Sequence, residues 1–242
     1  MARQLIFDLP TRVFHWLFAG LFASAWLIAN LAEHTAAFPY HMLAGLLLVA
    51  LVAFRLIWGV AGTRYARFQS FPLQPAALLR YFRSIFNGQR FRWAGHNPAS
   101  SWSALVLLAV AAGLGVTGYL MVSGGQSERY EDIHELLADV FLAVALLHVA
   151  GVVVHTLRHH DQFSRSMIDG RKSDCPDSSA IPGARPIAGI VLLMVIAGGG
   201  VYLVRGYDPD TGALRLPGVT LMLDEPEDAT GRWNRGRTDV SH

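Results

Sequence analysis

The amino-acid sequence predicts an all-α integral membrane protein with five transmembrane helices. Of the 242 residues, 52% are hydrophobic and 16% are charged, and soluble domains of this length rarely combine these values. Five apolar runs each approach the ~20 residues that cross ~30 Å of hydrocarbon. They cover residues 13–31, 42–60, 102–122, 136–154 and 187–204.

The first run resembles a secretory signal in one respect, because Arg3 and Arg12 precede it. A signal peptide has an apolar core of only ~7 to 15 residues. This run is longer and contains His15 and two tryptophans. We therefore predict a retained transmembrane helix.

The second run contains Arg55, fourteen residues after His41. A guanidinium within a span costs ~2.5 to 3.5 kcal/mol on insertion scales. Arg55 is therefore expected either to have an anionic partner or to snorkel to the membrane interface.

The third run follows Asn97 and Pro98, which are typical of a helix start. The alternative is that the loop containing these residues contacts a quinone. Three glycines of the third run match a dinucleotide-binding fingerprint by letter: Gly113, Gly115 and Gly118. No strand precedes them in the sequence pattern. They and the glycines at 198–200 of the fifth run therefore indicate close packing of helices or of a flat cofactor.

Basic residues are concentrated in alternate loops. The N-terminus, the second loop and the loop after the fourth run contain Arg3, Arg12, Arg64, Arg67, Arg80, Arg83, Arg90, Arg92, Arg158, Arg165, Arg171, Lys172 and Arg185. Arg129 is the one lysine or arginine in the first and third loops together. The positive-inside rule predicts a cytoplasmic N-terminus and a periplasmic C-terminal tail.

Four histidines near the ends of these runs form two pairs by depth. His134 opens the fourth run, and His148 follows fourteen residues later, which is ~21 Å along a helix and within ~40° of the same face. His15 lies at the cytoplasmic depth of His148, and His41 at the periplasmic depth of His134. A lone histidine at a helix end is usually interfacial, but matched pairs favour haem ligation. We predict two haems, held by His15 with His148 and by His41 with His134.

Other histidines compete with these ligands or lie outside the spans. His155 lies on nearly the same face as His148, seven residues further on, but at or beyond the membrane boundary, so we favour His148. His34, His96 and His242 are expected at the surface or in loops. For Arg55, a haem propionate is the expected anionic partner, and snorkelling remains the alternative.

Several motifs together resemble the bacterial cytochrome b561 family, in particular the b-type cytochrome subunit of nickel-iron hydrogenases. They are Asp8-Leu-Pro-Thr-Arg12, Phe14-His15-Trp16, Arg55-Leu-Ile-Trp-Gly59, Gly95-His-Asn-Pro98, His134-Glu135, Leu147-His148 and Met167-Ile-Asp-Gly170. The resemblance covers about residues 5 to 172. It implies a four-helix dihaem bundle, with a fifth transmembrane helix outside the matched part. The family's axial histidines map onto His15, His41, His134 and His148.

The resemblance also implies a function. Family members pass electrons between a periplasmic redox partner, such as a hydrogenase or a c-type cytochrome, and the quinone pool. We expect two b-type haems, a diffusible quinone docked near His155, His159, His160 and His96, contact with membrane lipid, no nucleic acid, and the bacterial inner membrane as location. The alternative is a superoxide:quinone oxidoreductase without a partner protein, for which Arg129 is the only basic residue in the short outer loops.

The chain divides into four predicted parts. Residues 1–172 form the dihaem membrane domain, 173–186 a cytoplasmic linker, 187–204 the fifth transmembrane helix, and 205–242 a periplasmic, partly ordered tail. The single cysteine, Cys175, excludes an intramolecular disulfide and a thiolate-bound metal cluster.

Overall fold

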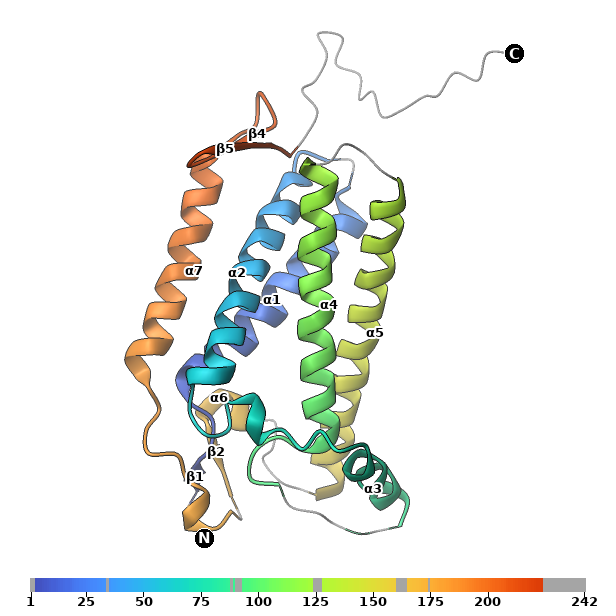
Figure 1. Ribbon diagram of the computed structural model, residues 1–242, viewed down its shortest axis with the longest axis vertical. Coiled ribbons are helices and arrows are strands. Elements are labelled where there is room, and N and C mark those ends of the chain that lie inside the picture. The colour runs from blue at the N-terminus through green and yellow to red at the C-terminus, as the bar shows by residue number, and fades with distance from the viewer. Residues whose placement is uncertain are drawn as a thin grey trace, which may run out of the picture.

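The computed structural model describes residues 3–33, 35–87, 89, 93–123, 128–159, 165–173 and 175–223. Its long apolar helices are α1 (Leu9–Leu31), α2 (Pro39–Ala61), α4 (Pro98–Ser123), α5 (Glu128–His159) and α7 (Pro186–Gly206). α1, α2, α4 and α5 form a bundle, and α7 packs against α1 and α2 (Figure 1). The predicted all-α membrane fold, with a four-helix bundle and a fifth spanning helix, is confirmed.

The spanning helices begin before the apolar runs, and their first turns contain polar residues and proline. Asp8 caps α1, where its Oδ1 atom accepts a hydrogen bond from the Thr11 N–H at 2.9 Å. Asn97 precedes α4, and its Oδ1 atom accepts from the Ser100 N–H at 2.8 Å. Such side chains satisfy N–H groups that a helix start leaves unpaired. The helix start predicted at Asn97 is therefore confirmed.

The two ends of the bundle have different accessory structure. One end has the amphipathic α3 (Pro75–Phe86), the short α6 (Ser166–Asp169), the 3-10 helices η1 (Phe68–Ser70) and η2 (Asp177–Ser179), and an antiparallel pair of β1 (Gln4–Leu5) with β2 (Arg171–Lys172). The other end has the antiparallel sheet β3 (Tyr207–Asp208), β4 (Ala213–Leu216) and β5 (Val219–Met222), in that order. We call these the α3 end and the sheet end (Figure 1).

The sheet is packed onto the bundle rather than separate from it. Four buried leucines from α2, α7, β4 and the residue after β5 form one cluster: Leu43, Leu203, Leu214 and Leu223. The Tyr40 and Tyr207 rings also meet, with centroids 6.4 Å apart. The described part of the tail, 207–223, thus packs against α2 and α7.

The centre of the bundle is aromatic. The Phe22 and Phe141 rings, from α1 and α5, stack with centroids 3.7 Å apart, and the Phe18 ring lies 5.6 Å from that of Phe141. Phe141 is only 3% exposed and lies seven residues from each of the two α5 histidines, His134 and His148. An apolar layer therefore separates the two ends of the bundle.

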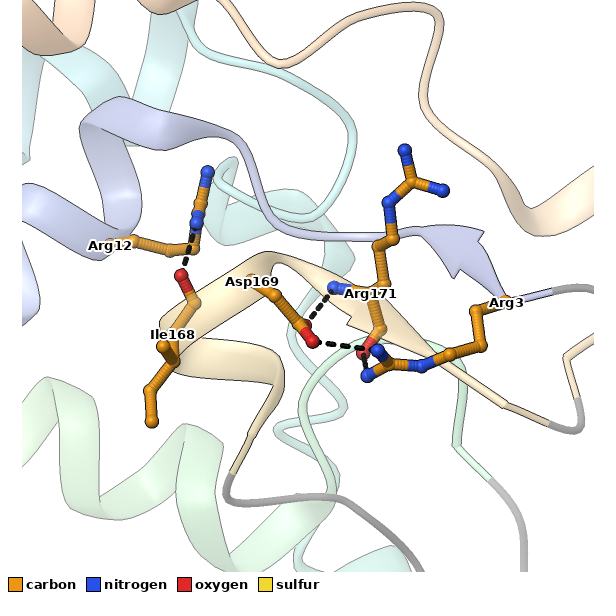
Figure 2. Close-up of polar contacts among 5 residues, drawn as sticks. All are labelled: Arg3, Arg12, Ile168, Asp169 and Arg171. Carbon is orange, nitrogen blue, oxygen red and sulfur yellow. Dashed lines mark hydrogen bonds and ion pairs between the residues drawn. The ribbon is translucent and has the colours of Figure 1, made fainter.

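At the α3 end, the segment after α5 is tied to the start of α1. Figure 2 shows the Asp169 carboxylate between the Arg3 guanidinium, at 2.7 Å, and the Arg171 N–H, at 2.9 Å. The Arg12 guanidinium donates to the Ile168 carbonyl at 2.5 Å. These contacts, with the β1–β2 pair, hold residues 168–172 against the start of α1, the helix that contains His15.

Candidate functional site

At the sheet end, α2 and α5 bring His41 and His134 together. Their ring centroids are 6.1 Å apart and their planes are inclined by 69°. Imidazole nitrogen binds first-row metals at about 2 Å and lies about 1 Å from its ring centroid, so two rings on opposite sides of one metal ion have centroids about 6 Å apart. The observed spacing therefore fits one metal ion held between the two rings.

Both rings of this sheet-end site are oriented through their Nδ1 atoms. His41 Nδ1 lies 2.9 Å from the Ala25 carbonyl oxygen of α1, which can only accept. His134 Nδ1 lies 2.8 Å from Thr117 Oγ1, and that hydroxyl donates to the Gly113 carbonyl at 3.0 Å. Both Nδ1 atoms are thus assigned as donors, which leaves each Nε2 lone pair free to bind a metal.

The glycines of α4 allow its neighbours to approach closely. A Cβ atom at Gly118 would lie 3.5 Å from His134 Cε1, and one at Gly113 would lie 3.0 Å from Leu137 Cδ1. A Cβ atom at Gly115 would overlap Val49 of α2 at 2.5 Å. These glycines serve helix packing and make room for the His134 ring, in agreement with the predicted packing role.

At the α3 end, His15 of α1 and His148 of α5 lie close enough to interact electrostatically. His15 Nδ1 is buried and has no hydrogen-bond partner among the described residues. His148 lines a cavity, to which His155 of the same helix also contributes. We call His15 and His148 the α3-end site.

Arg55 lies beside this site and does not snorkel. The residue is only 6% exposed, and three phenylalanine rings surround its guanidinium: Phe68 at 4.6 Å, Phe71 at 5.8 Å and Phe14 at 5.9 Å from centroid to Cζ. Its Nη1 atom is buried and has no hydrogen-bond partner in the described part of the chain.

His96 occupies a loop, as predicted, but its ring is not at the surface. Its centroid lies 4.7 Å from that of Phe71 and 5.1 Å from that of Phe7, and its Nδ1 atom is buried. Burial, reinforced by the charges of Lys172 and Arg55, lowers the pKa of His96 to about 3, so the imidazole is neutral. The sequence did not reveal this position, because Phe7 and Phe71 are distant in sequence. His34, His160 and His242, and the side chain of His159, lie outside the described residues.

A cavity of about 440 Å³ lies between α3 and the adjoining parts of α4 and α5. Aromatic and apolar side chains make up most of its wall, together with the polar residues Tyr81, Ser84, Gln89, Asn97, Ser100, Ser103, His148 and His155. Asn97 Nδ2 donates to the Tyr81 hydroxyl at 3.4 Å. The cavity therefore joins the α3-end site to polar groups near the end of the bundle.

The residues present fit haem better than a bare metal ion. Among the described residues, no group of three or more His, Cys, Asp and Glu side chains could hold a metal ion. Paired imidazoles are the ligand set of a haem iron, whose porphyrin supplies the other four nitrogens. Each end of the bundle offers one such pair.

Comparison with known proteins agrees with this chemistry. The family model described as prokaryotic cytochrome b561 matches residues 6–170, which include all four histidines and Arg55 but not α7 or the sheet. Searches of curated proteins and of solved structures each give no match. Since the family match spans more than half of the chain, the chain belongs to the prokaryotic cytochrome b561 family.

Proposed function

We propose that this membrane protein is a dihaem cytochrome b that transfers electrons between a periplasmic redox partner and the quinone pool. Membership of the cytochrome b561 family implies b-type haem and electron transfer. The observation that supports the paired ligation most strongly is the sheet-end site, where the two imidazole centroids are 6.1 Å apart and both Nδ1 atoms are hydrogen-bonded.

His41 and His134 would hold the sheet-end haem, and His15 and His148 the α3-end haem. When bound, each haem would supply a one-electron couple, and ligation by a pair of histidines would suit electron transfer rather than oxygen chemistry. The protein's own contribution is to fix the imidazoles and to exclude water between the sites. Phe18, Phe22 and Phe141 supply that apolar layer.

The cavity beside His148 is the proposed quinone site. Its wall is mostly apolar, as an isoprenoid quinone requires, and Tyr81, Asn97 and His155 offer polar atoms for the quinone carbonyls. His155 is the candidate to pass protons to the reduced quinone, because it lines the cavity and an imidazole can both donate and accept a proton. A quinone analogue that bound only at the sheet end would contradict this assignment.

The redox partner would dock at the sheet end. The predicted cytoplasmic residues Arg3, Arg12, Arg64, Arg67, Arg80, Arg83, Arg165, Arg171, Lys172 and Arg185 all belong to segments at the α3 end. The positive-inside rule then puts the sheet end in the periplasm of a bacterial inner membrane. A hydrogenase or a c-type cytochrome is the proposed class of partner.

Haem content per chain tests the proposal. We expect two b-type haems in the unaltered protein, one in His41→Ala or His134→Ala, and one in His15→Ala or His148→Ala, since each pair loses an axial ligand. His155→Ala should retain both haems but show slower haem reduction by a quinol. One haem or none in the unaltered protein, or loss of a haem in His155→Ala but not in His148→Ala, would contradict the ligand assignment.

A further inference from the structure

Two buried polar atoms beside the α3-end site have no hydrogen-bond partner among the described residues: Arg55 Nη1 and His96 Nδ1. The two side chains come from α2 and from the loop before α4. His15, Arg55 and His148 all lie within electrostatic range of the His96 ring. The unpartnered atoms and the two candidate axial ligands therefore belong to one cluster.

Among the described residues, Arg55 has no carboxylate hydrogen-bonded to its buried Nη1 atom. The carboxylate within electrostatic range of Arg55 is Asp8. Its oxygens already accept from the Thr63 hydroxyl at 2.6 Å, the Trp58 indole at 3.2 Å and the Thr11 N–H at 2.9 Å. A buried guanidinium whose donors lack a hydrogen-bonded anion is costly. Arg55 Nη1 could therefore donate to one further anionic group.

Lys172 adds a second cation to the same region. Its Nζ atom donates to the carbonyl oxygens of Gly95, at 2.8 Å, and Trp93, at 3.4 Å. These bonds hold the loop that contains His96. Lys172 and Arg55 both act electrostatically on the His96 ring, and cations at these positions favour an anion nearby.

The two donors are held in place before any ligand binds. The guanidinium of Arg55 is enclosed by Phe14, Phe68 and Phe71, and the His96 ring is packed between Phe7 and Phe71. A planar guanidinium matches a carboxylate geometrically. A neutral imidazole protonated on Nδ1 adds a second donor without adding charge.

We propose that Arg55 and His96 together bind a carboxylate of the α3-end haem, with His96 acting as a positioning residue for that haem. The inference rests on the proposed function, in which His15 and His148 are the axial ligands. The carboxylate is assigned to haem because the b-type haem implied by the family has two propionates, and because both axial histidines lie in the same cluster.

Variants of the full-length protein in detergent or nanodiscs test this assignment. Arg55→Met and His96→Leu should lower the affinity of the α3-end site for haem, by at least tenfold and by several-fold respectively. The α3-end haem should remain low-spin but have a lower midpoint potential, because the propionate charge is less compensated. His96→Gln, which retains a donor, should lie near the unaltered protein. Arg80→Met, which removes an exposed arginine of α3, is the charge-matched control and should change neither quantity.

Haem dimethyl ester identifies the anion. The ester lacks the propionate charge, so in the unaltered protein it should bind the α3-end site as weakly as haem binds the Arg55→Met variant. In Arg55→Met the preference of the α3-end site for haem over its dimethyl ester should fall by at least tenfold, and the remainder is the contribution of His96. If the ester binds the unaltered protein as tightly as haem does, the anion is another group, such as a lipid phosphate, and the proposal is wrong.

The remaining outcomes separate this inference from the proposed function. The sheet-end haem reports on folding in every variant, since His41 and His134 are at the opposite end of the bundle. A normal α3-end haem, in affinity and potential, in His96→Leu would overturn the role of His96 and leave the dihaem proposal intact. A high-spin α3-end haem in His96→Leu would make His96 an axial ligand, which also overturns it. Absence of this haem from the unaltered protein would refute the dihaem proposal itself.

Discussion

At the scale of single residues, neutral groups set the orientation of the sheet-end histidines. A backbone carbonyl, that of Ala25, accepts from His41, and one hydroxyl, that of Thr117, accepts from His134. Outer partners of this kind fix the tautomer and raise the basicity of the ligating nitrogen. Of the two, only the hydroxyl of Thr117 can be removed by substitution.

Thr117→Val should therefore weaken the sheet-end haem without changing the size of the side chain. Loss of an outer partner typically lowers affinity by ~10- to 100-fold, and we expect a change in that range for the sheet-end site alone. Haem titration of the apoprotein measures it, and Thr117→Ser, which retains the hydroxyl, is the control. Equal haem affinity in the valine and serine variants would show that the 2.8 Å contact has no role in binding.

The four candidate ligand histidines and Arg55 can be singled out from the sequence, but the contacts of Thr117 and His96 cannot. Spacing along a helix gives depth and face, and a guanidinium in an apolar run is conspicuous without any structure. The contact of Thr117 with His134 depends on how α4 and α5 are rotated about their axes. The burial of His96 depends on Phe7 and Phe71, which approach it only in the folded chain.

At the scale of elements, one face of α4 determines how closely α5 can approach. Gly118 leaves room for a methyl group, because a Cβ atom there would be 3.5 Å from His134 Cε1. A larger side chain would displace the ring that the Thr117 hydroxyl orients. Gly118 thus connects helix packing with the sheet-end site.

Gly118→Ile should empty the sheet-end site and leave the α3-end haem in place, whereas Gly118→Ala should retain both haems. Haem content and the reduced spectrum of each variant measure the outcome. Gly198→Ile is the matched control, since a Cβ atom at Gly198 of α7 meets no atom within 4 Å. Two haems in Gly118→Ile would mean that α4 and α5 separate at little cost.

The spans were predictable as elements, and the short structures at the two ends were not. The apolar runs lie within α1, α2, α4, α5 and α7, because lipid requires continuous apolar segments. The strands have only two to four residues, too few for an alternating pattern to be recognised. α3 is shorter than a span, at 12 residues, and in the sequence its basic residues indicate only a charged loop between two spans.

At the scale of the whole molecule, the α3 end depends on a close approach between two distant segments. Gly170 has a φ of 78°, and a Cβ atom there would lie 2.5 Å from the Phe7 carbonyl oxygen. The Gly170 carbonyl also accepts from the N–H groups of Ile6, at 2.8 Å, and Phe7, at 3.0 Å. Only glycine combines this conformation with this contact.

Gly170→Ala should lower the free energy of unfolding by about 1 to 3 kcal/mol, through backbone strain and the clash with Phe7. Thermal loss of the haem spectrum measures it, and the α3-end haem should be released first. Gly218→Ala separates the two causes: its φ is 82°, but its Cβ atom would meet nothing within 4 Å. Equal destabilisation by both variants would show that the approach of Phe7 adds nothing to the strain.

The distribution of charge over the molecule predicts its orientation, and the single cysteine makes the prediction measurable. Cys175 follows β2 at the basic α3 end, so a membrane-impermeant maleimide should label it only after the membrane is permeabilised. In a Cys175→Ser background, Thr220→Cys on exposed β5 should be labelled in intact cells whose outer membrane admits the reagent. Ala180→Cys, at an exposed position near Cys175, is a second reporter in case the partly buried thiol reacts slowly. The reverse pattern would put the basic end outside, and the redox partner and the quinone cavity would then have to exchange sides of the membrane.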